Sequence, residues 1–322
     1  MSKKPIIIGI ESSCDETAVA IIREKNDGRA EILSNIISSQ VDVHKEFGGV
    51  VPELAARSHI EKIDVIAKKA LEKSGIQLKD IDAVAATAGP GLIVCLSVGL
   101  NFGKAISASI GKPFIAVNHL EGHALSPRLN SKLDYPYLLL LISGGHSQYL
   151  CVKNLSEYKR LGTTIDDAIG EAFDKAGKLL GLGYPAGPLI DRYAQKGKSQ
   201  KYHFTFPKVS DLNYSFSGLK TQFLYFLNKE KNKNPLFIKQ ELNDICASYQ
   251  SHLIDYLLIK FKLALEMYPC KDIAIAGGVS ANSHLRKKFT NLGAKKGLNV
   301  HIPKMSFCTD NAAMIAMSGF FL

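Results

Sequence analysis

The apolar residues at the start of the chain form two compact runs separated by a short polar segment. Residues 5–11 (PIIIGIE) and 18–24 (AVAIIRE) are rich in β-branched side chains, whereas the segment between them, SSCDET, is small, hydroxylated and acidic. Apolar runs of this length are typical of buried strands. The pattern therefore predicts a hairpin whose turn carries polar side chains.

The spacing of apolar positions then alternates between helical and strand-like. Over residues 53–74 the apolar side chains recur three or four positions apart, and this helical pattern stops before Gly75. A strand that runs into the glycine turn 89–91 follows, then a helix over 96–110 and a strand over 112–119. Strands that alternate with helices indicate an α/β fold.

The second half of the chain repeats this layout. Residues 136–152 again give strand, small polar turn and strand, and 273–289 give strand, glycine pair and helix, while 236–268 form one long amphipathic helix with a core face. Two matched loops predict a duplicated, two-lobed architecture in which the loops face each other across a central cleft. Their N–H groups and hydroxyls suit phosphate oxygens, so nucleotide binding is favoured over plain turns.

Composition narrows the class of protein. The 322 residues are 46% hydrophobic and carry a net charge of +10, which suits a polyanionic partner, nucleic acid first and a membrane surface second. A generally basic proteome explains the charge equally well. The six cysteines form no C-x-x-C pair, which indicates free thiols in a reducing cytosol. The densest apolar run, 137–142, is strand-sized, so we expect no membrane span and a cytoplasmic protein.

A series of segments in one order carries a resemblance to a known family. The segments are GIESSCDET, GGVVPELAARSH, AGPGL, NHLEGH, LISGGHSQ, GEAFDKAGKLLGL, FSGLKT, GGVSAN and CTDNAAMIA. Together they cover nearly the whole chain and resemble the TsaD family, the bacterial threonylcarbamoyl-transfer subunit that modifies tRNA. The resemblance implies the actin/Hsp70/sugar-kinase (ASKHA) ATPase fold, with residues 1–130 and 306–322 in an N-terminal lobe and 131–305 in a C-terminal lobe.

The resemblance also implies a reaction and a set of partners. A threonylcarbamoyl group would move from threonylcarbamoyl-AMP to the exocyclic amine of the adenosine 3′ of the anticodon, in tRNAs that read codons beginning with A. A separate synthase would make the adenylate, and a TsaB-like paralogue and a TsaE-like ATPase would complete the complex. ATP or ADP is a further expected ligand of the cleft.

The segment NHLEGH places two histidines four residues apart. His119 and His123 would share one helix face and could chelate one ion, although surface histidines explain the pair equally well from the residues alone. Glu121 is two residues after the first histidine, not one as in H-E-x-x-H, which argues against a zinc-protease base. The family resemblance implies a metal site completed by Asp310, with one divalent ion per subunit, Fe²⁺ favoured and Zn²⁺ second. Taken alone, Asp310 would be read as a helix N-cap.

The acidic turn of the first hairpin supplies candidate catalytic groups. Asp15 and Glu16 could orient phosphates, hold a cation or accept a proton from the attacking amine, and Asp15 is the preferred base. An acidic turn that caps local N–H groups is the alternative.

The family resemblance also assigns residues that contact the acyl-adenylate. Asp174 would otherwise be a solvated carboxylate off the buried helix face, and Asn282 would equally serve as a helix cap. The segment YPAGP departs from the family's usual P-G-G-P at Ala186, which puts a close contact there in doubt. The full set is Leu141, Ile142, Ser143, Gly144, Gly145, Asp174, Gly187, Asp191 and Asn282.

Competing hypotheses remain at this stage. Lysine-rich segments such as QKGKSQKYHF and RKKFTNLGAKK could follow a tRNA backbone, or could simply be solvated loops. The alternative enzymes are a metal-dependent carbamoyltransferase and a sugar-kinase-like ATPase of the same fold. A non-enzymatic ATPase scaffold is a third possibility.

Overall fold

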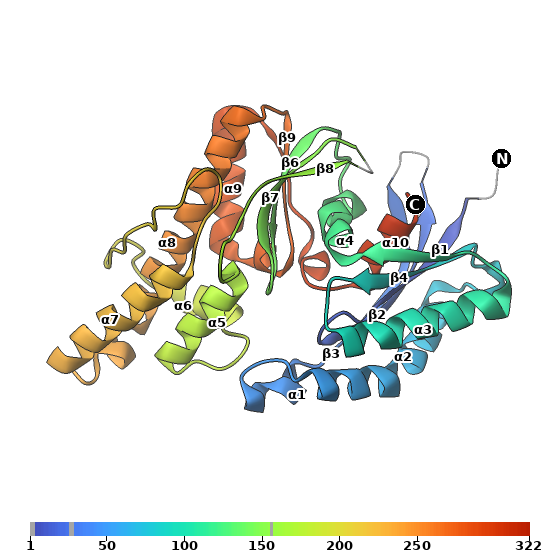
Figure 1. The fold of residues 1–322 in the computed structure, drawn as a ribbon, viewed down its shortest axis with the longest axis horizontal. Coiled ribbons are helices and arrows are strands. Elements are labelled where there is room, and N and C mark those ends of the chain that lie inside the picture. Colours follow the sequence, from blue (N-terminus) through green and yellow to red (C-terminus); the bar gives the residue numbers. More distant parts are fainter. Residues whose placement is uncertain (1–3, 26–28, 155–156) are drawn as a thin grey trace. The chain divides into compact units, whose positions relative to one another are not determined.

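The computed structural model describes residues 4–25, 29–154 and 157–322. These residues form two compact units, Met1–Leu133 with Pro303–Leu322, and Asp134–Ile302 (Figure 1). We call them the first and the second unit. Each contains one five-stranded sheet with helices packed on it.

The sheet of the first unit mixes antiparallel and parallel pairing. Its order is β3-β2-β1-β4-β5, in which the first three strands form an antiparallel meander and β1, β4 and β5 run parallel. The strands are β1 (Ile6–Glu11), β2 (Glu16–Glu24), β3 (Ala30–Ser39), β4 (Ala83–Gly89) and β5 (Phe114–Asn118). The predicted hairpin over residues 5–24 is confirmed, with every residue of β1 paired to β2, from Ile6 with Arg23 to Glu11 with Ala18.

The sheet of the second unit has the same topology. Its order is β10-β9-β6-β7-β8, again an antiparallel meander joined to two parallel strands. The strands are β6 (Tyr137–Ile142), β7 (Ser147–Val152), β8 (Tyr158–Thr163), β9 (Asp272–Ala276) and β10 (Asn299–His301). The matching order confirms the predicted duplicated α/β architecture.

Helices cover both faces of the first sheet. Because side chains alternate along a strand, Ile8 and Ile10 pack with Ile63 on one face, while Gly9 lies against α10 on the other. A Cβ on Gly9 would lie 2.4 Å from the carbonyl oxygen of Ala312, so the strand and the helix approach more closely than any side chain permits. The helices are α1 (Val41–His44), α2 (Pro52–Ser74), α3 (Ile93–Ile110), α4 (His119–Leu125) and α10 (Ala312–Gly319), with 3₁₀ turns at Lys45–Phe47, Leu78–Asp80, Ser126–Leu129 and Met305–Phe307.

The second unit is built around the long helix α8 (Phe237–Met267). Its residues Leu253 and Phe261 are fully buried, and the carbonyl of Leu257 accepts a hydrogen bond from the Tyr149 hydroxyl on β7 at 2.9 Å. The predicted core role of this helix is therefore confirmed. The other helices are α5 (Ile169–Leu180), α6 (Ala186–Ala194), α7 (Ser217–Lys233) and α9 (Ser283–Lys296), with a 3₁₀ turn at Gly278–Ala281.

One helix in the described ranges is long and apolar enough to cross a membrane by length and composition alone. This is α3, an 18-residue helix of which 28% is buried. The sequence predicts this helix but does not identify it as long and apolar enough to span a membrane, because small residues interrupt its apolar run. A single helix of this kind is weak evidence for a membrane, and α3 packs on β4 and on α2 within its unit. All six cysteines are free thiols, as expected.

Candidate functional site

The two histidines lie where β5 passes into α4. The side chain of Asn118, the last residue of β5, caps the helix by accepting from the N–H groups of Leu120 at 2.9 Å and Glu121 at 3.3 Å. This cap starts the helix at His119 and places His123 one turn later, with ring centroids 4.7 Å apart. Both side chains are buried. The predicted helical spacing of the pair is confirmed.

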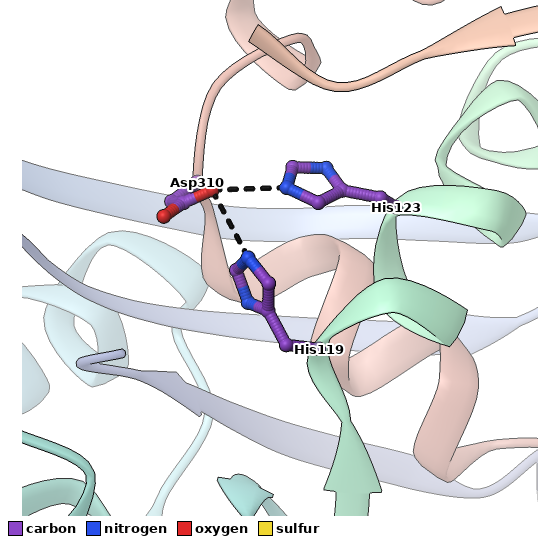
Figure 2. A group of neighbouring side chains, drawn as sticks. All are labelled: His119, His123 and Asp310. Carbon is purple, nitrogen blue, oxygen red and sulfur yellow. Dashed lines mark hydrogen bonds and ion pairs between the residues drawn. The ribbon is translucent and has the colours of Figure 1, made fainter. Parts of the chain in front are cut away.

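Asp310 joins the two imidazoles from the other end of the sequence. Its Oδ1 lies 3.0 Å from Nε2 of His123 and 3.5 Å from Nε2 of His119, and Figure 2 shows both rings pointing at this carboxylate. One ligand atom from each residue lies within 4.8 Å of the others. The interpretation of Asp310 as a helix cap was wrong, because α10 is capped by the next residue, Asn311, whose Oδ1 accepts from the N–H of Met314 at 3.0 Å.

A buried carboxylate behind His119 was missed by the sequence reasoning. Glu11, at the end of β1, is fully buried, and its Oε2 lies 3.2 Å from Nδ1 of His119 and 2.5 Å from the Thr87 hydroxyl. Its Oε1 accepts from the N–H of Ser13 at 2.5 Å. A glutamate at the end of a wholly apolar run was the available signal, since a buried charge needs partners.

Charge at the site favours a bound cation or a proton. Burial opposes protonation of His119, but the carboxylates of Asp310 and Glu11 outweigh it and raise the pKa of His119 well above 6.5. Burial likewise opposes ionisation of Asp310, yet the two histidines outweigh it and lower the pKa of that carboxyl. A positive charge is therefore stabilised between these side chains.

The donor set fits a divalent transition metal. A carboxylate only accepts, so Nδ1 of His119 donates to Glu11 and, in the neutral ring, the lone pair of Nε2 faces the oxygen of Asp310. A proton satisfies these two acceptors, and a metal ion could take the place of that proton. A carboxylate behind a ligating imidazole is the usual outer partner at metal sites, and two nitrogens with one oxygen suit both iron and zinc.

The acidic turn lies next to this cluster in the first unit. Burial raises the pKa of Glu16, and the carboxylates of Asp310 and Asp15 raise it further. The turn thus places two carboxyl groups close to Asp310 and the histidine pair.

The predicted acyl-adenylate residues all lie in the second unit. Leu141 and Ile142 are fully buried residues of β6 that pair with β7, so their side chains are committed to the core. Gly144 and Gly145 are exposed, and a Cβ on either would meet no atom within 4 Å. These two glycines therefore offer an open backbone at the turn after the buried Ser143.

Asp174 is not the solvated carboxylate that helix periodicity suggested. It is half-buried, and its Oδ1 accepts from the N–H of Ala186 at 2.8 Å at the start of α6. Burial raises the pKa of Asp174, against the opposing effect of the N–H groups of Ala186 and Gly187. The methyl group of Ala186 is buried against Gly177, and a Cβ built on that glycine would lie 2.1 Å away. The departure from the family pattern is therefore accommodated by packing inside the unit.

Asp191 and Asn282 meet at the start of α9. Asp191 accepts from the N–H of Ser283 at 3.1 Å and from its hydroxyl at 2.8 Å. Asn282 caps the helix by accepting from the N–H of Leu285 at 3.0 Å, and its side-chain amide donates to Gln250 at 2.7 Å. The cap interpretation of Asn282 is confirmed, and its proposed adenine contact stays a prediction.

Comparison with known proteins gives a consistent family. The family model described as "tRNA N6-adenosine threonylcarbamoyltransferase" (TsaD) matches residues 31–317. Proteins of that name are 58% identical in Pelagibacter ubique (strain HTCC1062), over 99% of this chain and 90% of the relative, and 48% identical in Sinorhizobium medicae (strain WSM419), over 97% and 88%.

Solved structures at low identity show the fold alone. HypF of T. kodakarensis aligns with a TM-score of 0.65 at 13% identity, over 99% of this chain and 48% of that one. The activator of 2-hydroxyisocaproyl-CoA dehydratase from Clostridium difficile, solved with bound ADPNP, aligns with a TM-score of 0.52 at 11% identity, over 99% and 94%. These neighbours share the two-lobed ATPase fold that the resemblance implied. By the match along most of its length and its identity to these relatives, the chain belongs to the tRNA N6-adenosine threonylcarbamoyltransferase family.

Proposed function

We propose that this chain transfers a threonylcarbamoyl group from threonylcarbamoyl-AMP to N6 of the adenosine 3′ of the anticodon, in tRNAs that read codons beginning with A. The family match over residues 31–317, which includes the His119, His123 and Asp310 cluster, carries the proposal. The amine nitrogen forms a bond to the acyl carbon, the bond from that carbon to the phosphate oxygen breaks, and AMP leaves with the electron pair. The amine also loses a proton, which needs an acceptor.

His119, His123 and Asp310 would hold one divalent ion, Fe²⁺ first and Zn²⁺ second. When bound, such an ion would orient and polarise oxygen atoms of the acyl donor through its open coordination positions. Glu11 would fix the ring of His119 through Nδ1 and raise the basicity of Nε2. On His123, Nδ1 is buried and has no partner in the described part of the chain, so no outer hydrogen bond supports that ring from behind, as Glu11 supports His119.

Asp15 is the proposed proton acceptor, and Glu16 its partner. An adenine amine is a weak nucleophile, so a carboxylate held at the reacting nitrogen would assist the attack. Burial and the neighbouring carboxylates raise the pKa of Glu16, so this group loses its proton less readily than an exposed glutamate.

Residues of the second unit would bind the adenylate. The open backbone at Gly144 and Gly145 suits phosphate oxygens. Asp174 and Asp191 would reach the ribose beside Gly187, using lone pairs that their backbone contacts leave available. Asn282 would contact the adenine. ATP or ADP would occupy the same residues when the acyl donor is absent.

The proposed partners follow from the charge, the exposed surface and the family. Lysines of the second unit would follow the tRNA backbone, and among them Lys201 is already ion-paired with Asp244 at 2.9 Å. On α3, Ile93 and Val94 are 78% and 41% exposed, an apolar surface suited to a protein partner such as the TsaB-like paralogue. A TsaE-like ATPase and a separate adenylate synthase complete the proposed set. A tRNA substrate would place the reaction in the cytoplasm.

One assay tests the transfer itself. The protein is incubated with its partner subunits, threonylcarbamoyl-AMP and unmodified tRNA, and the digested nucleosides are analysed by mass spectrometry. We expect threonylcarbamoyladenosine from wild type and none from His119→Ala, with nucleotide binding retained. A mixture that a known relative makes competent, but in which this chain forms no modified adenosine, would refute the proposal.

The same assay separates the alternatives. The family comparisons support acyl transfer to tRNA and not the carbamoyltransferase or the sugar kinase. With threonylcarbamoyl-AMP as the acyl donor, neither a carbamoyltransferase nor a kinase would give threonylcarbamoyladenosine. A scaffold without catalysis would support its partners equally well after His119→Ala.

A further inference from the structure

His59, a buried residue of α2, contacts the backbone of the acidic turn, which we also call the acidic loop and which spans residues 12–15 between β1 and β2. Nε2 of His59 lies 2.9 Å from the carbonyl oxygen of Cys14, and its Nδ1 lies 2.7 Å from the hydroxyl of Thr17. A carbonyl only accepts, so Nε2 carries the hydrogen and Nδ1 accepts from Thr17. The chemistry of the two partners therefore fixes the tautomer of this fully buried ring.

Two further buried side chains, those of Gln40 and His44, continue the polar contacts of His59 on the side away from Cys14. Nε2 of Gln40 lies 3.2 Å from Nδ1 of His59, and its Oε1 lies 3.4 Å from Nε2 of His44. Nδ1 of His44 accepts from the N–H of Val51 at 3.3 Å. Nδ1 of His59 has one lone pair, which accepts from the closer Thr17 hydroxyl, so the Gln40 amide donates to the carbonyl of Ala55 at 3.4 Å. Buried polar contacts of this kind rigidify the segments they join.

The backbone of the acidic loop is tied at three consecutive carbonyls. The carbonyl of Ser13 accepts from the N–H of Leu92 at 2.8 Å, and that of Asp15 accepts from the N–H of Gln40 at 2.9 Å. His59 holds the carbonyl between them, that of Cys14. Leu92 and Gln40 donate from their backbones, whereas His59 donates from its side chain. A substitution at His59 therefore removes one of the three contacts and keeps the donors of the other two.

We propose that His59 is a positioning residue for acyl transfer, which fixes the backbone of the 13–15 loop through the Cys14 carbonyl and thereby holds the Asp15 carboxylate in place for the reaction. The proposal rests on the proposed function, because the placement of Asp15 affects the rate only if that carboxylate takes part. A catalytic group displaced by about 1 Å loses on the order of 100-fold in rate. His59 itself touches no reacting atom.

The test compares three variants in the transfer assay. His59→Phe fills the space without a donor, His59→Gln supplies an N–H at comparable reach, and Ile63→Val removes one methyl group from the buried face of the same helix without touching the loop. For each variant we measure kcat, KM for tRNA and Zn²⁺ affinity. We also measure hydrogen exchange of the backbone N–H of Gln40, which donates to the carbonyl of Asp15 and so reports whether the loop is held in place.

We expect His59→Phe to lower kcat about 10- to 100-fold, with KM and Zn²⁺ affinity within about threefold of wild type and faster exchange at Gln40. His59→Gln should recover most of kcat, and Ile63→Val should keep it. An unchanged kcat in His59→Phe, or an equal loss in Ile63→Val, would overturn the positioning role. An inactive wild type in a competent mixture would overturn the proposed function first, and the role of His59 with it.

Discussion

Replacing Glu11 by glutamine would test whether this carboxylate supports the metal site through His119. The side chain is fully buried, accepts from Ser13 and Thr87, and lies 3.2 Å from Nδ1 of His119. Glutamine keeps the size but removes the charge and turns one acceptor into a donor. The perturbation therefore acts on the electronics of His119 with little change in packing.

The structure sets the scale of the effect. At 3.2 Å a carboxylate attracts a protonated imidazole by about 5 kcal/mol at an effective dielectric constant near 20, an upper bound for any effect on His119. A metal-bound ring is neutral and senses the carboxylate only through its basicity and orientation. Loss of an outer partner of this kind costs about 10- to 100-fold in metal affinity, or roughly 1.4–2.7 kcal/mol. We therefore expect the Kd for Zn²⁺ to rise by that factor in Glu11→Gln.

The assay is a competition titration of metal-free protein with Zn²⁺ against a chromogenic chelator. Glu31→Gln is the matched control, because Glu31 lies on β3 with its side chain 47% exposed in an ion pair with Arg23. Its affinity should equal that of wild type. A Kd for Glu11→Gln within twofold of wild type, in a protein whose circular dichroism is unchanged, would refute the claim that Glu11 tunes His119.

Three further predictions concern stability and its separation from metal binding. Gly9→Ala should lower the free energy of unfolding, measured by urea denaturation, by about 1–3 kcal/mol, because the new Cβ would meet the carbonyl of Ala312. The Cβ of the control Gly49→Ala would meet no atom, so this variant should be near neutral. Equal effects of the two substitutions would contradict the close approach of β1 and α10. Asn311→Ala should cost about 1 kcal/mol of stability and keep Zn²⁺ binding, whereas Asp310→Ala should abolish Zn²⁺ binding; unchanged Zn²⁺ affinity in Asp310→Ala would contradict its role as a ligand. Burial is the largest influence on His59 and lowers its pKa, against the opposing effects of the hydrogen bond to the Cys14 carbonyl and of the carboxylates of Glu11 and Asp15. The unfolded chain therefore binds more protons below pH 6.5, and stability present above that pH is lost as the pH falls. His59→Gln should lose less stability than wild type between pH 7.5 and 5.5, and an identical slope would refute the assignment.

Much of the fold could be predicted because the relevant elements are strongly patterned. The first hairpin has continuous apolar runs, and α2 ends at Gly75 in the left-handed conformation, as its sequence indicated. The strands β3 and β8 were not predicted, because both lie at a sheet edge and expose part of each face, so neither shows a clean period. Edge position depends on strand order, which the local pattern does not contain.

In the candidate site too, contacts set by local spacing could be predicted, whereas contacts set by the arrangement of strands could not. The pairing of His119 with His123 depends only on helical spacing, which the sequence shows directly. The contact of Glu11 with His119 depends on the register that places β1, β4 and β5 side by side. The choice between Asp310 and Asn311 as the helix cap turns on one residue of backbone geometry, where boundaries are least certain.

The junction of the first strand with the last helix also governs when the protein becomes competent during synthesis. Asp310 follows His123 by 187 positions, and α10 packs on β1. A nascent polypeptide still on the ribosome carries both imidazoles long before the aspartate is translated, and β1 lacks its covering helix until α10, Ala312–Gly319, has been made. A product that ends before residue 310 would thus lack both the third ligand and the helix that covers one face of the first sheet. Translation must therefore pass residue 310 before the cluster can exist.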